Sequence, residues 1–163
     1  MNSGNISSQA LHVAIVGGGP RGLAAVEAVA GQMQDRKVAV TLFEPHKAPG
    51  AGPNYAPDQT PLNLLNIPLR AIDLPEPEQG EAFEAWFDGA YGLDDYPPRA
   101  VIGGYLQARF AALHERLAIE VVGREVIDCD PVKGGWLLST NDGSDHGPFV
   151  EVLLCPGHQP VRD

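Results

Sequence analysis

The sequence predicts an α/β fold that is built on a parallel β-sheet and carries a helical insertion and a small antiparallel β-meander. Two observations lead to this prediction. A strand, a glycine-rich turn, a helix and a second strand follow one another before residue 44, and four short strand-like runs follow a later helical stretch. A strand–helix–strand unit nearly always forms a right-handed crossover between parallel strands. With 163 residues, 44% of them hydrophobic, the chain is expected to form one domain with a hydrophobic core.

The first unit contains two strands and one helix. The run HVAIV at residues 12–16 is apolar and rich in β-branched residues, as strands are, and VAVTLF at 38–43 has the same character. Between them, Pro20 suits the first turn of a helix that we expect to reach about Gln34. The apolar stripe of this helix recurs at steps of three and four residues and comprises Leu23, Val26, Ala30 and Met33.

The stretch from Glu44 to Glu78 has no regular periodicity. It contains eight prolines, which prevent a persistent helix or central strand. Long loops inside a compact domain are commonly functional or disordered. Because the segment LNLLNIPLRAIDL is apolar, we expect an ordered loop.

Helical periodicity returns after this loop. Residues 79–90 are expected to be helical, with Phe83, Trp86 and Phe87 on one face. A longer helix is expected over residues 100–117. Its apolar stripe comprises Val101, Tyr105, Leu106, Phe110, Leu113 and Leu117.

The last third of the chain is expected to be strands. Four runs have strand character, at residues 119–122, 125–129, 135–140 and 149–155. Turn signals at 131–135 and at Asn141-Asp142-Gly143 separate them. These later strands look antiparallel, which is the basis for the predicted meander.

Composition excludes several classes of function. The chain has 11 Lys and Arg against 21 Asp and Glu, and a net charge of −10 argues against a nucleic-acid-binding surface. No run approaches the roughly 18 apolar residues that span a bilayer, and the polar N-terminus lacks the features of a secretory signal. We therefore expect a soluble, cytoplasmic protein with a flexible leader at residues 1–11. The two cysteines and five scattered histidines have no ligand spacing, so we expect no metal site.

The most specific motif is the G-x-G-x-x-G sequence that joins the first strand to the first helix. Gly17 would permit the tight turn, Gly19 would let a pyrophosphate approach the backbone, and Gly22 would let the helix pack closely. Pro20 and Arg21 lie within the motif and open the helix. The helix N-terminus offers free amides and a partial positive charge, which suit a phosphate.

An acidic residue completes this fingerprint. Glu44 ends the second strand, 22 residues after Gly22, and is followed by Pro45. A carboxylate there can accept hydrogen bonds from the ribose of an adenosine and would repel a 2′-phosphate. The pattern therefore favours FAD or NAD over NADP. The other interpretation is a structural glycine turn beside a solvated glutamate.

Six segments together resemble a known protein family. They are VAIVGGGPRGLAAVEAVA, LFEP, GAGPNYAPDQ, LNLLNIP, YPPRAVIGGYL and LLCPGHQP, and they extend from residue 12 to residue 160. The sequence resembles the FAD/NAD(P)-binding family of bacterial flavoproteins that includes FAD-dependent urate hydroxylase-like proteins. This family is distantly similar to flavin N-hydroxylating and Baeyer–Villiger monooxygenases. The resemblance implies a Rossmann-like FAD-binding domain over residues 12–160, as the N-terminal part of a larger two-dinucleotide flavoprotein.

The resemblance also implies roles for individual residues. The three motif glycines would hold the FAD pyrophosphate, Glu44 the adenosine ribose, and the backbone of Val126 the adenine. The final strand of similar proteins ends in Ala-Thr-Gly, whose glycine passes near the flavin nucleotide. Here it ends in Cys155-Pro156-Gly157, which keeps only the glycine. Gly157 is therefore either a flavin contact or an ordinary turn.

The proline-rich loop of similar proteins lies along the cofactor. Gly52, Asn63 and Asn66 are candidate contacts on that basis, although a turn with self-capping asparagines is an equal alternative. Arg99, at the start of the second long helix, could approach a phosphate or lie on the helix surface.

The function implied by the resemblance is that of the FAD-binding portion of an NAD(P)H-dependent oxidoreductase. Such an enzyme would be a monooxygenase or hydroxylase that acts on a small molecule. NADPH would be a co-substrate only with a second domain or a partner chain, and we expect no enzymatic NADPH oxidation by these 163 residues alone. No catalytic residue is identified. The alternative is a non-catalytic FAD- or NAD-binding module or partner subunit.

Overall fold

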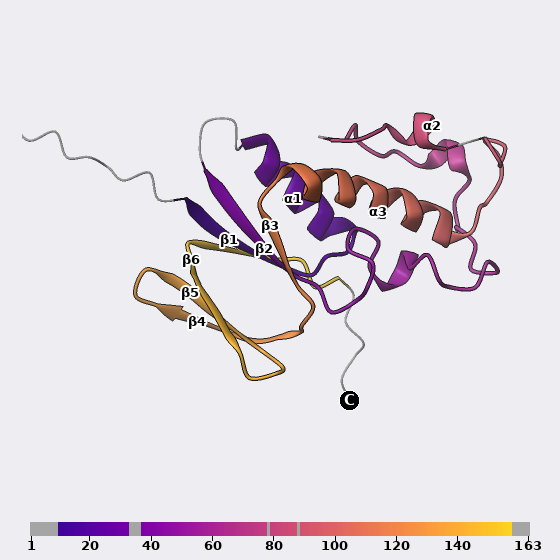
Figure 1. Ribbon diagram of the computed structural model, residues 1–163. Helices are drawn as coiled ribbons and strands as arrows, with labels where there is room; N and C mark the ends of the chain where they lie inside the picture. The colour runs from indigo at the N-terminus through magenta and orange to yellow at the C-terminus, as the bar shows by residue number, and fades with distance from the viewer. Residues whose placement is uncertain (1–9, 33–36, 78, 88, 158–163) are drawn as a thin grey trace, which may run out of the picture.

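The computed structural model describes residues 10–32, 37–77, 79–87 and 89–157. Its centre is a four-stranded parallel sheet with strand order β3-β2-β1-β7, and a three-stranded antiparallel sheet has the order β4-β5-β6. Figure 1 shows two long helices over one face of the parallel sheet and the antiparallel sheet on its other side. The predicted α/β architecture, with its parallel sheet, helical insertion and antiparallel meander, is confirmed.

The first unit folds as predicted. β1 is Leu11–Val16, α1 is Pro20–Gln32 and β2 is Val38–Phe43. β1 and β2 are parallel, with Leu11 opposite Val38 and Val16 opposite Phe43. β1 begins one residue before the predicted start of the domain. Most of the predicted leader and the predicted end of the helix, including Met33 and Gln34, lie outside the described residues.

The proline-rich segment is ordered and contains two short 3₁₀ turns, η2 (Pro53–Tyr55) and η3 (Leu69–Ala71). It is held by backbone bonds to a later segment. The amide of Leu65 donates to Pro97 O at 2.9 Å, and that of Leu69 donates to Asp95 O at 3.0 Å.

The helix predicted over residues 79–90 is much shorter than expected. α2 comprises only Phe83–Trp86, because Ala82 before it and Phe87 after it are extended. The predicted aromatic face nevertheless packs against another part of the protein. Phe83 and Trp86 pack against the ring of Tyr105, with centroid distances of 5.1 and 5.4 Å. Phe83 and Trp86 thus share one face of this single helical turn, and that face packs on Tyr105.

The second long helix, α3, is Arg99–Arg116 and leads into β3, Ile119–Val122. The prediction that this strand belongs with the antiparallel group was wrong, since β3 pairs with β2 in parallel. A helix between two strands permits that parallel pairing. Within the described part of the chain, no helix is long and apolar enough to cross a membrane.

The antiparallel sheet contains β4 (Val126–Val132), β5 (Gly135–Thr140) and β6 (Asp145–Phe149). The prediction of one strand over residues 149–155 was wrong. Phe149 ends β6, whereas β7 (Glu151–Leu154) joins the parallel sheet beside β1. The chain changes sheets at Val150, whose amide donates to His12 O at 2.9 Å.

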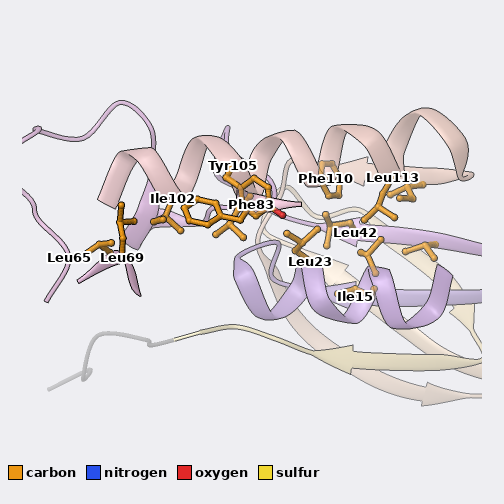
Figure 2. Close-up of a cluster of buried hydrophobic side chains, with 14 residues drawn as sticks. Ile15, Leu23, Leu42, Leu65, Leu69, Phe83, Ile102, Tyr105, Phe110 and Leu113 are labelled. Carbon is orange, nitrogen blue, oxygen red and sulfur yellow. The ribbon is translucent and has the colours of Figure 1, made fainter. Parts of the chain in front are cut away.

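The parallel sheet separates two hydrophobic clusters because neighbouring residues of a strand face opposite sides. Ile15 faces the larger cluster, between the sheet and the helices, and Ala14 faces a smaller one against the antiparallel sheet. Figure 2 shows Phe110 and Leu113 of α3 pointing toward Leu23 of α1 and Leu42 of β2.

Candidate functional site

The glycine-rich turn lies at the carboxyl edge of the parallel sheet, between β1 and α1. Its first amide, Gly17 N, donates to Phe43 O at 2.8 Å, which holds the turn beside the end of β2. Gly17 has a φ of 97°, and a Cβ on Gly22 would collide with Gly17 O. These two positions therefore require glycine for the tight turn and for close packing of the helix, as the motif predicts.

The N-terminus of α1 faces outward from this turn. Pro20 is the first helical residue and Arg21 the second, and both are exposed. Leu23 N donates a helical hydrogen bond to Gly19 O at 2.9 Å. The N-terminus of α1 and its dipole would therefore favour a negatively charged group in front of the turn.

The proline-rich loop packs directly on the glycine turn. Gly50 N donates to Gly18 O at 2.6 Å. Gly52 has a φ of 63°, and a Cβ there would lie 3.0 Å from the Cα of Gly19. A side chain at position 52 would therefore be strained and would press on the turn. The structure thus places Gly52 beside Gly19 of the glycine turn.

Glu44 is buried, with only 4% of its surface exposed, which contradicts the alternative interpretation of a solvated glutamate. Its Oε2 accepts a 2.6 Å hydrogen bond from Gly18 N. Its Oε1 accepts a 2.8 Å bond from the amide of His46 and lies 2.7 Å from the ring Nδ1 of the same histidine. These contacts fix the carboxylate next to the glycine turn.

Another segment near the glycine turn is the connection between β3 and β4 together with the first residue of β4. It comprises Arg124, Glu125 and Val126. Arg124 forms an ion pair with Asp142 of the β5–β6 turn, with Nε 2.8 Å from Oδ2. Hydrogen bonds from the Thr140 hydroxyl and from Arg124 hold the pKa of Asp142 well below its usual value.

The end of β7 lies beside the glycine turn. Cys155 N donates to Val16 O at 2.7 Å, and a Cβ on Gly17 would collide with Cys155 O. Burial raises the pKa of the Cys155 thiol, against a smaller opposing effect of Arg21. Gly157 has a φ of 72° and lies at the same edge.

These walls enclose a cleft of about 790 Å³, within the usual range of about 300–1,000 Å³ for small-molecule sites. It is lined by segments from across the chain, which are Val16, Gly17, Gly19–Arg21, Phe43–His46, Ala51–Tyr55, Arg124–Val126 and Cys155–Gly157. A smaller cavity of about 470 Å³ lies beside it and shares Pro45, His46, Gly52 and Pro53 with the cleft.

Most of the predicted site residues meet in this cleft. They are Gly17, Gly19, Pro20, Arg21, Glu44, Pro45, Gly52, Val126 and Gly157. Gly22 lies behind the turn. The remaining three, Asn63, Asn66 and Arg99, do not line the cleft. Arg99 instead bonds to the loop, with its amide 2.8 Å from Asn63 O and its Nε 3.2 Å from Leu64 O.

Sequence reasoning missed several cleft residues. His46 follows Glu44 by two positions, and Arg124 precedes Val126 by two, so proximity to known candidates was a usable signal. Tyr55 had no such signal, since its place depends on a loop without periodicity. Among the described residues, no group of three His, Cys, Asp or Glu side chains could hold a metal ion.

Comparison with known proteins places these features in context. The family model described as "FAD-NAD(P)-binding" matches residues 14–159. A similar curated protein is the nitrosuccinic acid synthase npaA of Aspergillus oryzae, which is 29% identical over 172 aligned positions. The match covers 92% of this chain but only 26% of that protein.

Two solved structures have a similar fold. A flavin-containing monooxygenase from Stenotrophomonas maltophilia has a TM-score of 0.63 and 17% identity, with 94% of this chain and 42% of that chain covered. Tmm from Pelagibacter sp. strain HTCC7211 has a TM-score of 0.66 and 18% identity, with 93% and 37% covered. The chain thus spans well under half the length of these proteins.

Proposed function

The chain belongs to the FAD-NAD(P)-binding family, and from this premise we propose that the cleft beside the glycine turn binds FAD. The observation that carries the proposal is the convergence of three features on one cleft. These are the glycine turn at the start of α1, the buried carboxylate of Glu44, and the end of β7. Each feature suits a different part of an adenine dinucleotide.

The residues present fit such a ligand. Gly19 faces open space except for Gly52, whose Cα lies 3.8 Å from the position of a Gly19 Cβ, so a phosphate can approach the backbone there. The amides at the start of α1 and the side chain of Arg21 would bind the pyrophosphate. No acidic side chain other than Glu44 and Glu125 lines the described cleft, and Glu44 is already bonded to the turn.

Glu44 would bind the adenosine ribose through Oε2. This oxygen accepts a hydrogen bond from Gly18 N, whereas Oε1 receives two contacts from His46. A carboxylate oxygen can accept two hydrogen bonds, so Oε2 has capacity for a ribose hydroxyl. A 2′-phosphate would meet the negative charge of Glu44, which supports FAD or NAD over NADP at this position. Val126 would meet the adenine through its backbone.

The whole protein would be an NAD(P)H-dependent flavin oxidoreductase of the monooxygenase type. The similar proteins named above as a synthase and as a flavin-containing monooxygenase support an enzyme over a non-catalytic module. When bound, the flavin would supply the redox chemistry, and the residues of this chain would bind and orient it. NADPH would act as co-substrate together with a second nucleotide site, from another domain or a partner chain.

Ligand identification and titration test the proposal. Protein purified without added nucleotide is denatured, and the released ligand is identified by its absorbance and mass. Apo-protein is then titrated with FAD, NAD and NADP. FAD is expected to be released and to bind most tightly. Tighter binding of NAD than of FAD would contradict the proposal.

A further inference from the structure

One cationic side chain that lines the cleft, that of Arg124, has no role in the proposed function. Arg124 lies between β3 and β4, and 54% of its side chain is exposed. We propose that the guanidinium of Arg124 is the surface on which the adenine base stacks, and that Asp142 positions it. This inference rests on the proposed binding of an adenine dinucleotide.

The backbone places Arg124 next to the ribose end of the cleft. Val122 O accepts a hydrogen bond from Glu44 N at 3.0 Å and another from Arg124 N at 2.9 Å. The two residues therefore flank a single carbonyl oxygen. In a nucleoside, the base is attached to the ribose whose hydroxyls Glu44 would bind. A base that leaves a ribose held at Glu44 meets the wall formed by residues 124–126.

The β5–β6 turn holds the Arg124 side chain. Asp142 accepts from Arg124 Nε at 2.8 Å, and its other oxygen accepts from the Thr140 hydroxyl at 2.8 Å and from Ser144 N at 3.1 Å. Thr140 is fully buried. A second bond ties the same turn to the cleft wall, since Asn141 N donates to Glu125 O at 2.9 Å. The Asp142 carboxylate is thus held in place by contacts that do not involve Arg124.

These contacts suit stacking. Arg124 Nη1 also donates to Gly123 O at 3.0 Å, so this bond and the one from Nε both use donors at the edge of the guanidinium. Hydrogen bonds at the edge orient the plane and leave the flat faces for an aromatic ring. Guanidinium planes stack on aromatic rings and on bases, whereas the ammonium of lysine is a point charge without a plane.

The test compares three variants and one control. Arg124→Lys keeps the charge but removes the plane, Arg124→Gln removes both, and Asp142→Asn removes the charge that orients the arginine. Arg70→Gln is the control, because Arg70 has a comparable exposed ion pair with Asp94 and lies outside the cleft. Calorimetric titration with ADP gives each dissociation constant, and thermal unfolding shows that each variant is folded.

Stacking predicts that Arg124→Lys and Arg124→Gln both weaken ADP binding by roughly 3- to 30-fold. Asp142→Asn should weaken it less, and Arg70→Gln should leave it unchanged. Full ADP affinity in Arg124→Lys would overturn the inference in favour of a simple charge contact. If Arg124→Gln does not fold, the ADP affinity of Arg124→Lys tests the inference, provided that this variant has the melting temperature of the wild type.

A second probe separates the base from a 2′-phosphate. Adenosine 2′,5′-bisphosphate should lose the same factor as ADP in Arg124→Gln. A much larger loss would assign Arg124 to the 2′-phosphate and overturn the inference. If the wild-type chain binds ADP and all three variants bind it equally, only this inference fails. If the wild-type chain binds neither FAD nor ADP, the proposed function fails, and this inference fails with it.

Discussion

At the scale of single residues, the carboxylate of Glu44 has partners in the fold as well as a place in the cleft. It receives hydrogen bonds from Gly18 N and His46 N and lies within bonding distance of the His46 ring. Its burial means that removal of the side chain leaves the amide of Gly18 without this acceptor. A binding measurement on Glu44→Ala alone would therefore mix two effects.

A pair of variants separates them. Glu44→Gln keeps the shape and an acceptor oxygen but removes the charge, so we expect FAD binding to weaken by about 1.5–3 kcal/mol, with a smaller change in stability. Glu44→Ala should weaken binding and also lower the free energy of unfolding by about 1–3 kcal/mol. Titration with FAD and urea denaturation measure the two quantities. Unchanged FAD affinity in both variants would remove Glu44 from the binding site.

Asp142 gives a pH-dependent prediction. Its pKa is lowered in the folded protein, chiefly by the Thr140 hydroxyl and then by Arg124, so its contribution to stability is present above the unfolded pKa of about 3.9. That contribution is lost as the pH falls through the lower folded pKa. Asp142→Asn should therefore be less stable than the wild type at pH 6–7, by a margin that shrinks below about pH 4. Urea denaturation across this range measures the margin, and a constant difference at all pH values would contradict the prediction.

At the scale of secondary-structure elements, a buried ion pair connects the two long helices. Arg109 of α3, only 3% exposed, donates to both oxygens of Glu27 on α1, at distances of 2.7–2.9 Å. Arg109 also donates to Pro75 O at 2.9 Å and lies over the ring of Tyr105. The pair thus joins α1, α3 and the proline-rich segment at one point.

Breaking one half of this pair should cost more than replacing both halves. Arg109→Met leaves a buried, unpaired carboxylate and is expected to lower the free energy of unfolding by about 3–5 kcal/mol. The double variant Glu27→Met with Arg109→Met leaves no buried charge and should recover a large part of that loss. Chemical denaturation of both proteins tests this double-mutant comparison. Equal or additive losses would show that the pair does not act as a unit.

The same elements show what local sequence can predict. The strand–turn–helix–strand unit was predicted to within a residue or two at its described boundaries, because its periodicity and its glycine turn are local signals. The helix around the aromatic run at 83–87 was predicted too long, since only Phe83–Trp86 is helical and Ala82 and Phe87 are extended. The sheet change at Val150 was missed because residues 149–155 are apolar apart from Glu151 and include no glycine or proline to mark a break. The two strands are assigned to different sheets only by the strands to which they are hydrogen-bonded, β5 for β6 and β1 for β7.

At the scale of the whole molecule, the cleft is formed by segments far apart in the sequence. The glycine turn and Glu44 could be predicted because a motif fixes their spacing. Tyr55 could not, since it reaches the cleft through a loop without periodicity, and the signal for Arg124 was its place two residues before Val126. Asn63 was a candidate by resemblance and Arg99 by its place at the start of a helix, but the structure joins them by a backbone bond away from the cleft lining.

Because the cleft joins distant segments, ligand binding should stabilise the domain as a unit. A ligand that binds only the folded state at 100 times its dissociation constant adds about 2.7 kcal/mol to the free energy of unfolding. We expect FAD at that excess to raise the denaturation midpoint. Hydrogen exchange should slow in residues 44–55 and 122–126 together. Protection confined to the glycine turn would contradict a shared cleft.

The position of β7 has a consequence for how the protein is made. β7 follows all the other described strands in the sequence, yet it pairs with β1, the first of them, and Cys155 O lies against Gly17. Because the ribosome synthesises the chain from the N-terminus, the glycine turn emerges long before β7, which lies beside it in the folded domain. A stalled nascent chain that ends at Phe149 is therefore expected not to retain FAD, whereas one extended past Gly157 and clear of the exit tunnel should. Cofactor capture would then mark the moment at which the two ends of the domain meet.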